Sequence, residues 1–113
     1  MSAYLIYLCY GVSDRAELET YWEVTQVTFQ DQDMKVHTAY TPIEVLEGDE
    51  DVQGVVIAEF PSYDACKAWY DGPGYREARK HRLRGADYLG ILVDGGFIPA
   101  ADRMIHTRDN IPA

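Results

Sequence analysis

The chain has 113 residues, of which 9 are Tyr, 3 Phe and 2 Trp, a composition that suffices for one domain with a packed core and argues against disorder. Its 19 acidic residues outnumber its 10 Lys and Arg, and the net charge of −9 disfavours nucleic acid and membrane surfaces as partners. No apolar run approaches the roughly 18–20 residues of a membrane-spanning helix. With no basic N-terminal region typical of a signal peptide, we expect a cytoplasmic protein with Cys9 and Cys66 reduced.

Residues 3–9 form an apolar and aromatic run that predicts a strand. Both of its alternating sets are apolar: Tyr4, Ile6 and Leu8 on one side, Leu5, Tyr7 and Cys9 on the other. A strand that is apolar on both sides is covered on both sides. In a chain this small its own helices can cover one face, and a second subunit is the simplest cover for the other.

A helix is predicted from about residue 14 to residue 29. Asp14 and Glu17 have the spacing of a capping box. The apolar stripe follows helical spacing and consists of Leu18, Tyr21, Trp22, Thr25 and Phe29. Tyr21 and Thr25 place hydroxyl groups on this stripe, and these groups either bond to backbone in the core or line a cavity.

The segment 35–46 predicts a second strand, at a sheet edge or with a bulge because Pro42 interrupts it. Residues 47–51 are an acidic turn without the spacing of a calcium-binding loop, so we expect no metal there. A third strand is predicted over 52–60. Pro61 ends it and Ser62 caps the next helix.

That helix is expected to stop at 71–72, and Pro73 suits the first turn of a second helical segment that ends at Gly85. A fourth strand is predicted over 86–93. The order β-α-β-β-α-β is the α+β, ferredoxin-like arrangement, in which both helices cover one face of a four-stranded antiparallel sheet. Because the strands are apolar on both sides, the uncovered face predicts a homodimer.

We therefore predict a domain over residues 1–96 and a C-terminal extension over 97–113. The extension contains Phe97, Ile98, Met104 and Ile105, which are too apolar for a purely solvated tail. We expect it to dock along its own subunit or to reach the partner; the alternative is a frayed end.

Several short motifs resemble the DUF1330 family of the dimeric α+β barrel superfamily. They are V-L-E-G-D at 45–49, E-F-P-S at 59–62, A-W-Y-D at 68–71, P-G-Y-R at 73–76 and D-G at 94–95. The resemblance covers about residues 1–95 and implies the fold and a homodimer. The family's general function is undefined.

The chain departs from the family pattern in two places. Residues 31–34 replace the Gly-Gly that usually precedes a basic strand, and the tail after Gly96 is additional. Relatives in the superfamily include quinone-forming monooxygenases without cofactors, polyketide cyclases, muconolactone-type isomerases and haem-degrading enzymes. The resemblance implies a pocket between sheet and helices.

Tyr75, Arg79 and Arg82 share one face of the last helix. A buried guanidinium needs an anionic partner. This partner is either a carboxylate of the protein, for which Glu44, Glu59 and Asp87 are candidates, or an anionic group of a ligand, which suits the planar fork of arginine.

His37 is the candidate acid–base residue, because its pKa lies near neutrality. Tyr40 follows on the same strand, although strict alternation places the two on opposite faces unless a bulge intervenes. His81 is expected to face solvent and His106 lies in the tail, so the three histidines form no recognisable metal site.

These residues favour an enzyme without a cofactor that binds a small hydrophobic or aromatic carbonyl compound. Tyr21, Trp22, Thr25, Trp69, Tyr75 and Arg79 would bind the substrate, and His37, Tyr40 and Arg82 would carry proton-transfer chemistry of the cyclase, isomerase or lyase type. The alternatives are a monooxygenase that forms quinones and a non-catalytic binding or scaffold dimer.

Overall fold

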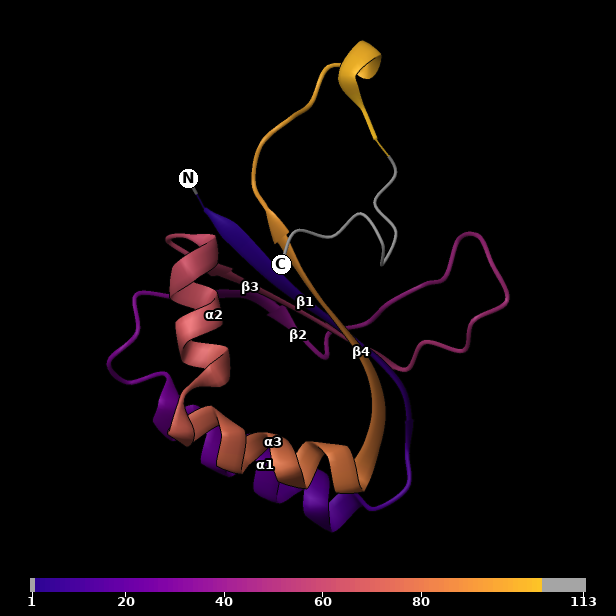
Figure 1. The fold of residues 1–113 in the computed structure, drawn as a ribbon. Helices are drawn as coiled ribbons and strands as arrows, with labels where there is room; N and C mark the ends of the chain where they lie inside the picture. The colour runs from indigo at the N-terminus through magenta and orange to yellow at the C-terminus, as the bar shows by residue number, and fades with distance from the viewer. Residues whose placement is uncertain (1, 105–113) are drawn as a thin grey trace.

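The computed structural model describes residues 2–104 and confirms the predicted order of elements (Figure 1). The elements are β1 (Ala3–Val12), α1 (Arg15–Thr28), β2 (Lys35–Ala39), β3 (Gly54–Phe60), α2 (Tyr63–Asp71), α3 (Pro73–Gly85), β4 (Ala86–Asp94) and the short 3-10 helix η1 (Ala100–Asp102). The fold is therefore α+β.

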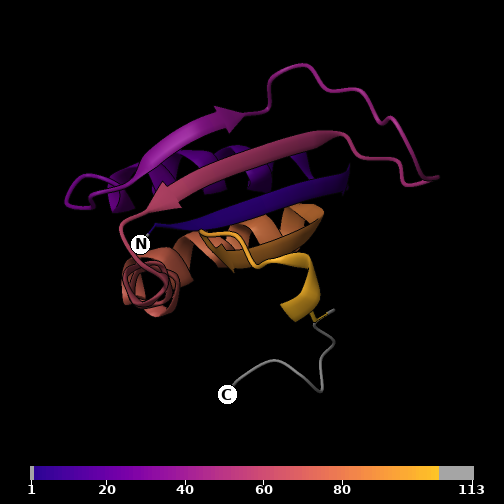
Figure 2. The same ribbon diagram turned by 90° about the horizontal axis from the view of Figure 1, so that it is seen from above.

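The four strands form one antiparallel sheet in the order β2-β3-β1-β4 (Figure 2). β1 is central, and Ile6 pairs with Ile57 of β3 on one side and with Ile91 of β4 on the other. The helices lie on one side of the sheet, where α1 and α3 run side by side (Figure 1). This ferredoxin-like arrangement leaves the other face of the sheet without a covering layer.

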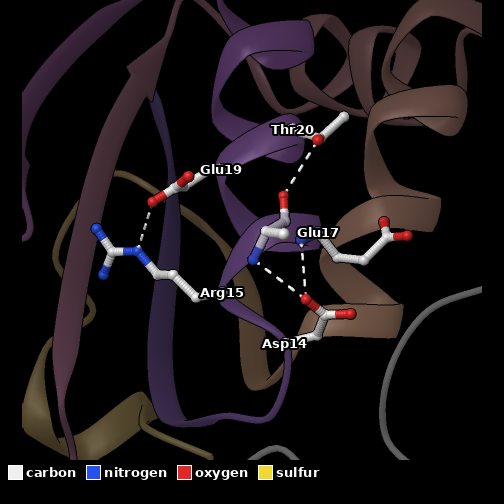
Figure 3. A network of polar contacts seen from close by, with 6 residues as sticks. Asp14, Arg15, Glu17, Glu19 and Thr20 are labelled. Atoms are coloured by element: carbon white, nitrogen blue, oxygen red, sulfur yellow. Dashed lines mark hydrogen bonds and ion pairs between the residues drawn. The ribbon is translucent and has the colours of Figure 1, made fainter.

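The N-terminus of α1 is capped as the sequence predicts (Figure 3). The carboxylate of Asp14 accepts hydrogen bonds from the backbone N–H groups of Ala16 at 3.1 Å and Glu17 at 3.3 Å. Arg15 and Glu19 form an ion pair at 3.1 Å on the exposed side of the first turns. The cap satisfies two of the backbone donors that every helix leaves free at its start.

The predicted break between two helical segments is present. Ser62 caps α2 by accepting a hydrogen bond from the N–H of Ala65 at 3.0 Å, and Gly72 ends this helix. Pro73 then begins α3. Proline suits that position because its missing N–H would have no partner in a first turn.

The second strand is shorter than predicted. The sequence pattern placed it over 35–46, but β2 ends at Ala39, because Tyr40 has a φ of 58° and leaves the extended conformation. The segment 41–51, which includes Pro42 and the V-L-E-G motif, is exposed and projects beyond the sheet (Figure 2). β3 likewise begins at Gly54, two residues later than predicted.

The core lies between the sheet and the helices. It is built largely from aromatic and small side chains, namely Leu5, Tyr7, Leu18, Tyr21, Ala58, Phe60, Cys66, Trp69, Tyr75 and Ala78. Cys9 and Cys66 are both buried as free thiols. On the strands, residues that face the core alternate with residues on the uncovered face, as the pleat requires.

Residues 97–104 do not dock along their own subunit, one of the two placements expected from the sequence. They extend away from the helices (Figure 1), and Phe97 is 81% exposed. Arg103 folds this segment on itself by donating to the carbonyl of Ile98 at 2.8 Å and by lying over the ring of Phe97. Ile105 and His106 fall outside the described residues.

Within residues 2–104, no helix combines the length and apolar character needed to cross a membrane.

Candidate functional site

A cavity of about 460 Å³ lies between α1 and the helix-covered side of the sheet. Its walls are predominantly apolar and aromatic, formed by Leu5, Tyr7, Tyr21, Trp22, Thr25, Gln26, Phe29, Met34, Val36, Ala39, Tyr40, Val56, Ala58 and Trp69. Gln26, Val36, Ala39 and Tyr40 are exposed and lie where the cavity meets solvent. Size and lining are those of a small-molecule site, for which roughly 300–1,000 Å³ is usual.

Three tyrosine hydroxyls meet at one end of this cavity. The hydroxyl of Tyr75 lies 2.7 Å from that of Tyr7 and 2.8 Å from that of Tyr21. Tyr7 comes from the central strand, Tyr21 from α1 and Tyr75 from α3, so the cluster joins three elements. Tyr7 and Tyr21 line the cavity, while Tyr75 lies behind them and is fully buried.

Arg82 lies against this cluster. Its guanidinium carbon is 4.7 Å from the ring centre of Tyr7, 5.2 Å from that of Tyr88 and 5.8 Å from that of Tyr21. The side chain is buried, its Nε has no hydrogen-bond partner, and among residues 2–104 no carboxylate forms an ion pair with it. The three carboxylates that the sequence offered as partners are thus not used, and the rings around Arg82 supply cation–π contacts instead.

The tyrosines near Arg82 are neutral at physiological pH. Burial raises the pKa values of Tyr7, Tyr21, Tyr75 and Tyr88 well above the value of about 10 usual for tyrosine. For Tyr7, Tyr21 and Tyr75 the positive charge of Arg82 opposes this rise. The hydroxyl groups therefore remain protonated and can donate hydrogen bonds.

Arg82 keeps its charge. Burial lowers the pKa of its guanidinium, yet the net pKa lies above the ordinary value for arginine. The cluster is therefore a set of neutral donors with one buried cation behind them, an arrangement that favours a negatively charged oxygen in the adjoining cavity.

Tyr40 closes the cavity towards β4. Its hydroxyl accepts a hydrogen bond from Trp22 Nε1 at 3.0 Å and lies 2.7 Å from the hydroxyl of Tyr88. The ring lies over Gly54, where a Cβ atom would come within 2.9 Å of it. Tyr40 has a φ of 58°, in the left-handed region of backbone conformation. Holding a non-glycine residue there costs roughly 1–3 kcal/mol of folding free energy, and such residues cluster at functional sites.

Thr25 lines the cavity and carries a buried, unsatisfied polar group. Its Oγ1 is buried and has no hydrogen-bond partner. The sequence left open whether this hydroxyl bonds to backbone or lines a cavity. The residue lines the cavity, but its hydroxyl oxygen is buried and bonds to no backbone group within residues 2–104. Its neighbour Thr28 differs, because Thr28 Oγ1 accepts from Trp69 Nε1 at 3.1 Å and donates to the backbone of Thr25 at 2.6 Å.

His37 lies away from the cavity. A bulge between Val36 and Thr38 interrupts its strand, and Nε2 of His37 donates to Glu59 at 2.7 Å. Glu59 points to the uncovered face of the sheet, between Ala58 and Phe60, which point to the core. The hydrogen bonds from Ser2 and His37 lower the pKa of this carboxyl group. His37 and Tyr40 are therefore not brought together.

The other predicted residues fall into two groups. Tyr21, Trp22, Thr25, Tyr40 and Trp69 line the cavity, whereas Tyr75 and Arg82 lie directly behind its wall.

Two basic side chains lie elsewhere. Arg79 stacks on Tyr70, with its guanidinium carbon 4.2 Å from the ring centre, and does not reach the cavity. His81, expected to face solvent, instead bridges α3 to α1 by a 2.6 Å contact with Glu17. The described part of the chain contains no group of three or more His, Cys, Asp or Glu that could hold a metal ion.

Two tyrosines that contact Arg82 escaped the sequence analysis, Tyr7 and Tyr88. Tyr7 was assigned only to a strand with two apolar sides, and Tyr88 only to the fourth strand. A usable signal was the glycine that follows Tyr88 by two residues: Gly90 pairs with Tyr7, and a Cβ atom there would come within 2.6 Å of the Tyr7 ring. Small residues on a strand leave room for a large neighbour.

A family model described as a domain of unknown function, DUF1330, matches residues 2–96. No curated protein sequence matches the chain.

Solved structures share the fold. A protein of unknown function from Rhodopseudomonas palustris is 23% identical with a TM-score of 0.70, over 86% of this chain and 84% of that one. SnoaB, a cofactor-independent oxygenase from Streptomyces nogalater, is 17% identical with a TM-score of 0.55, over 88% and 96%. A dimeric protein of unknown function with a ferredoxin-like fold from Bacteroides fragilis is 12% identical with a TM-score of 0.56, over 83% and 96%.

Proposed function

The chain belongs to the DUF1330 family, and we propose that this member binds a flat hydrophobic or aromatic carbonyl compound in the α1 cavity and stabilises its enolate. The observation that carries the proposal is the contact of three tyrosine hydroxyls with one another beside the buried Arg82, which forms no ion pair within residues 2–104. The chemistry is keto–enol proton transfer, as in cyclases and isomerases, in which water or a buffer base takes up the proton and the protein's hydroxyl groups stabilise the enolate oxygen.

One of the three hydroxyl protons in the cluster is not used in a hydrogen bond within the cluster. Tyr7, Tyr75 and Tyr21 carry three hydroxyl protons, and their two mutual hydrogen bonds use two of them. If Tyr75 donates to Tyr7, the proton of Tyr7 is free to bond a ligand, and if Tyr75 donates to Tyr21, the proton of Tyr21 is free. Reorienting the cluster thus moves the free donor between two points of the cavity wall.

Arg82 acts through these hydroxyls as a positioning residue. Its charge lies within 6 Å of the ring centres of Tyr7 and Tyr21 and favours negative charge on an oxygen bound to either hydroxyl. Donors that are fixed in advance around a developing oxyanion are worth roughly 10²–10³ in rate each. His37 has no part in this proposal, because it lies on the other face of the sheet.

Deuterium exchange into 2-tetralone tests the proposal, because exchange next to a carbonyl measures enolate stabilisation whichever base removes the proton. We expect the protein to accelerate exchange in heavy water, followed by proton NMR. Tyr21→Phe combined with Tyr7→Phe should abolish most of the acceleration, whereas Tyr63→Phe, on the exposed side of α2, should not. Exchange at the buffer rate in the wild type would rule out the assignment.

A second candidate is a monooxygenase that acts without a cofactor. It is favoured by the absence of an ionisable base among the residues lining the cavity, which suits a substrate that ionises by itself and then reacts with oxygen. The structural relative SnoaB is described as a cofactor-independent oxygenase. Dependence of product formation on dissolved oxygen separates this reaction from proton transfer.

We further propose a homodimer formed through the uncovered sheet face. That face is apolar: Leu8 of the central strand lies between Val55 and Leu89, and Ile6 lies between Ile57 and Ile91. The two β4 residues, Leu89 and Ile91, are each 43% exposed. Exposed apolar surface of this extent is rare on monomers. A scaffold dimer without a ligand site is the less favoured alternative, because it requires Arg79 and Arg82 to be paired with carboxylates, and neither forms such a pair within residues 2–104.

A further inference from the structure

We propose that the α1 cavity binds an anion in preference to a neutral ligand, namely the ionised form of a flat aromatic phenol or enol. This inference rests on the proposed function and names its substrate class. It follows from three properties of the cavity: which groups its wall lacks, which charge lies behind the wall, and how that charge reaches the ligand.

The wall contains donors but no base. None of the residues that line the cavity carries a carboxylate, imidazole, thiol or amine. The hydroxyls of Tyr7 and Tyr21 remain protonated because of burial and so cannot remove a proton from a neutral ligand at physiological pH. A ligand that loses its proton in solution needs no base from the protein.

The charge behind the wall is positive and lacks a counter-ion. Arg82 is 5% exposed, its Nε is unpartnered, and no described carboxylate forms an ion pair with it. A buried charge is costly unless it is paired. A bound anion would supply the missing negative charge and would thereby be stabilised itself.

The charge reaches the cavity through Tyr7 and Tyr21, which lie between Arg82 and the open space. Two other cations lie beside lining residues: Arg15, whose guanidinium lies 4.9 Å from the ring centre of Trp22, and the exposed Lys35, which stands between Met34 and Val36 in the chain. Arg15 is exposed and already paired with Glu19. Arg82 is therefore the cation whose charge is available to a ligand.

The apolar wall decides which anions fit. Trp22, Phe29 and Trp69 present aromatic surface, which cannot replace the water bound to a compact carboxylate or phosphate. A phenolate or enolate spreads its charge over a flat ring system. It can place its oxygen against the tyrosine hydroxyls and stack its apolar part on these rings.

The probe is 4-nitro-1-naphthol, which is ionised at neutral pH, and its matched neutral compound is 1-methoxy-4-nitronaphthalene. Isothermal titration calorimetry should show the anion binding to the wild type at least tenfold more tightly than the ether. Arg82→Met should reduce this ratio to near one. Arg84→Met, an exposed position on the same helix, should leave the ratio unchanged, as should Arg15→Met.

If circular dichroism shows that Arg82→Met does not fold, the double variant Tyr7→Phe, Tyr21→Phe provides the same test, since it removes the donors while keeping the rings. Equal affinity for anion and ether in the wild type overturns the anion inference but leaves the cavity as a ligand site. Binding of neither compound overturns the site and the proposed function with it. An anion preference that survives in a folded Arg82→Met also overturns the inference.

Discussion

The guanidinium carbon of Arg82 lies 4.7 Å from the ring centre of Tyr7, so that α3 meets the central strand through a cation and an aromatic face rather than through an ion pair. Tyr7 also bonds through its hydroxyl to Tyr75, which lies about two turns before Arg82 on the same face of α3. The contact links the packing of the core to the electrostatics of the cavity, and the predictions below separate these two roles.

Tyr75→Phe should destabilise the fold. The substitution removes the hydroxyl that bonds to both Tyr7 and Tyr21 and leaves two buried hydroxyls without their partner. We expect a loss of about 1–3 kcal/mol in the free energy of unfolding, measured by urea denaturation. Tyr63→Phe is the control, because Tyr63 is half-exposed and forms no side-chain hydrogen bond to residues 2–104. Equal stability of both variants would mean that the hydroxyl cluster contributes nothing.

Gly54→Ala should disturb Tyr40. The new Cβ atom would lie 2.9 Å from the ring of Tyr40, which two hydrogen bonds hold in place. Overpacking of this kind costs roughly 1–3 kcal/mol, and displacement of the ring should also weaken binding of 4-nitro-1-naphthol. Gly11→Ala is the matched control, because nothing lies within 4 Å of a Cβ atom there. If Gly54→Ala denatures at the same urea concentration as Gly11→Ala, the packing of Tyr40 is looser than described.

Alkaline pH should unfold the protein as the buried tyrosines ionise. Their folded-state pKa values are raised by burial, so the folded state holds these protons more tightly than the unfolded state, in which tyrosine ionises near about 10. Stability from this source is complete below the unfolded pKa and declines as pH rises towards the folded values. Absorbance at the tyrosinate band should therefore rise in two phases, the second coinciding with loss of circular dichroism.

The contribution of the hydroxyl cluster to that second phase can be isolated. Tyr75→Phe should remove one tyrosine from it, whereas Tyr63→Phe should not. A single phase complete before unfolding would contradict the raised pKa values.

Ile91→Lys should disrupt the proposed dimer. Ile91 lies on the edge strand β4, on the uncovered sheet face beside Ile6 of the central strand, and a lysine there would place charge within the interface. We expect sedimentation equilibrium to give a dimer for the wild type and a monomer for the variant. Leu83→Lys, on the exposed side of α3, should remain dimeric. A wild type that sediments as a monomer at all concentrations would refute the dimer.

Local sequence patterns were sufficient for the order of elements and for the inward stripe of α1. The cap at Asp14, the break at Gly72–Pro73 and the inward stripe containing Tyr21 and Thr25 depend on neighbours within a few turns, and the structure agrees with each. Alternation also distinguished the two faces of the central strand, because side chains change sides at every residue. These features follow from short-range geometry, which a single sequence displays.

The site itself was decided by tertiary structure. Tyr7, Tyr21 and Tyr75 meet only because β1, α1 and α3 pack together, and no local period relates positions on three elements. The second strand shows the same limit: a bulge and the left-handed Tyr40 direct His37 to Glu59 and Tyr40 to the cavity. The sequence by itself thus determined the fold and a plausible face for the site, while long-range packing decided which hydroxyls surround the unpaired charge of Arg82.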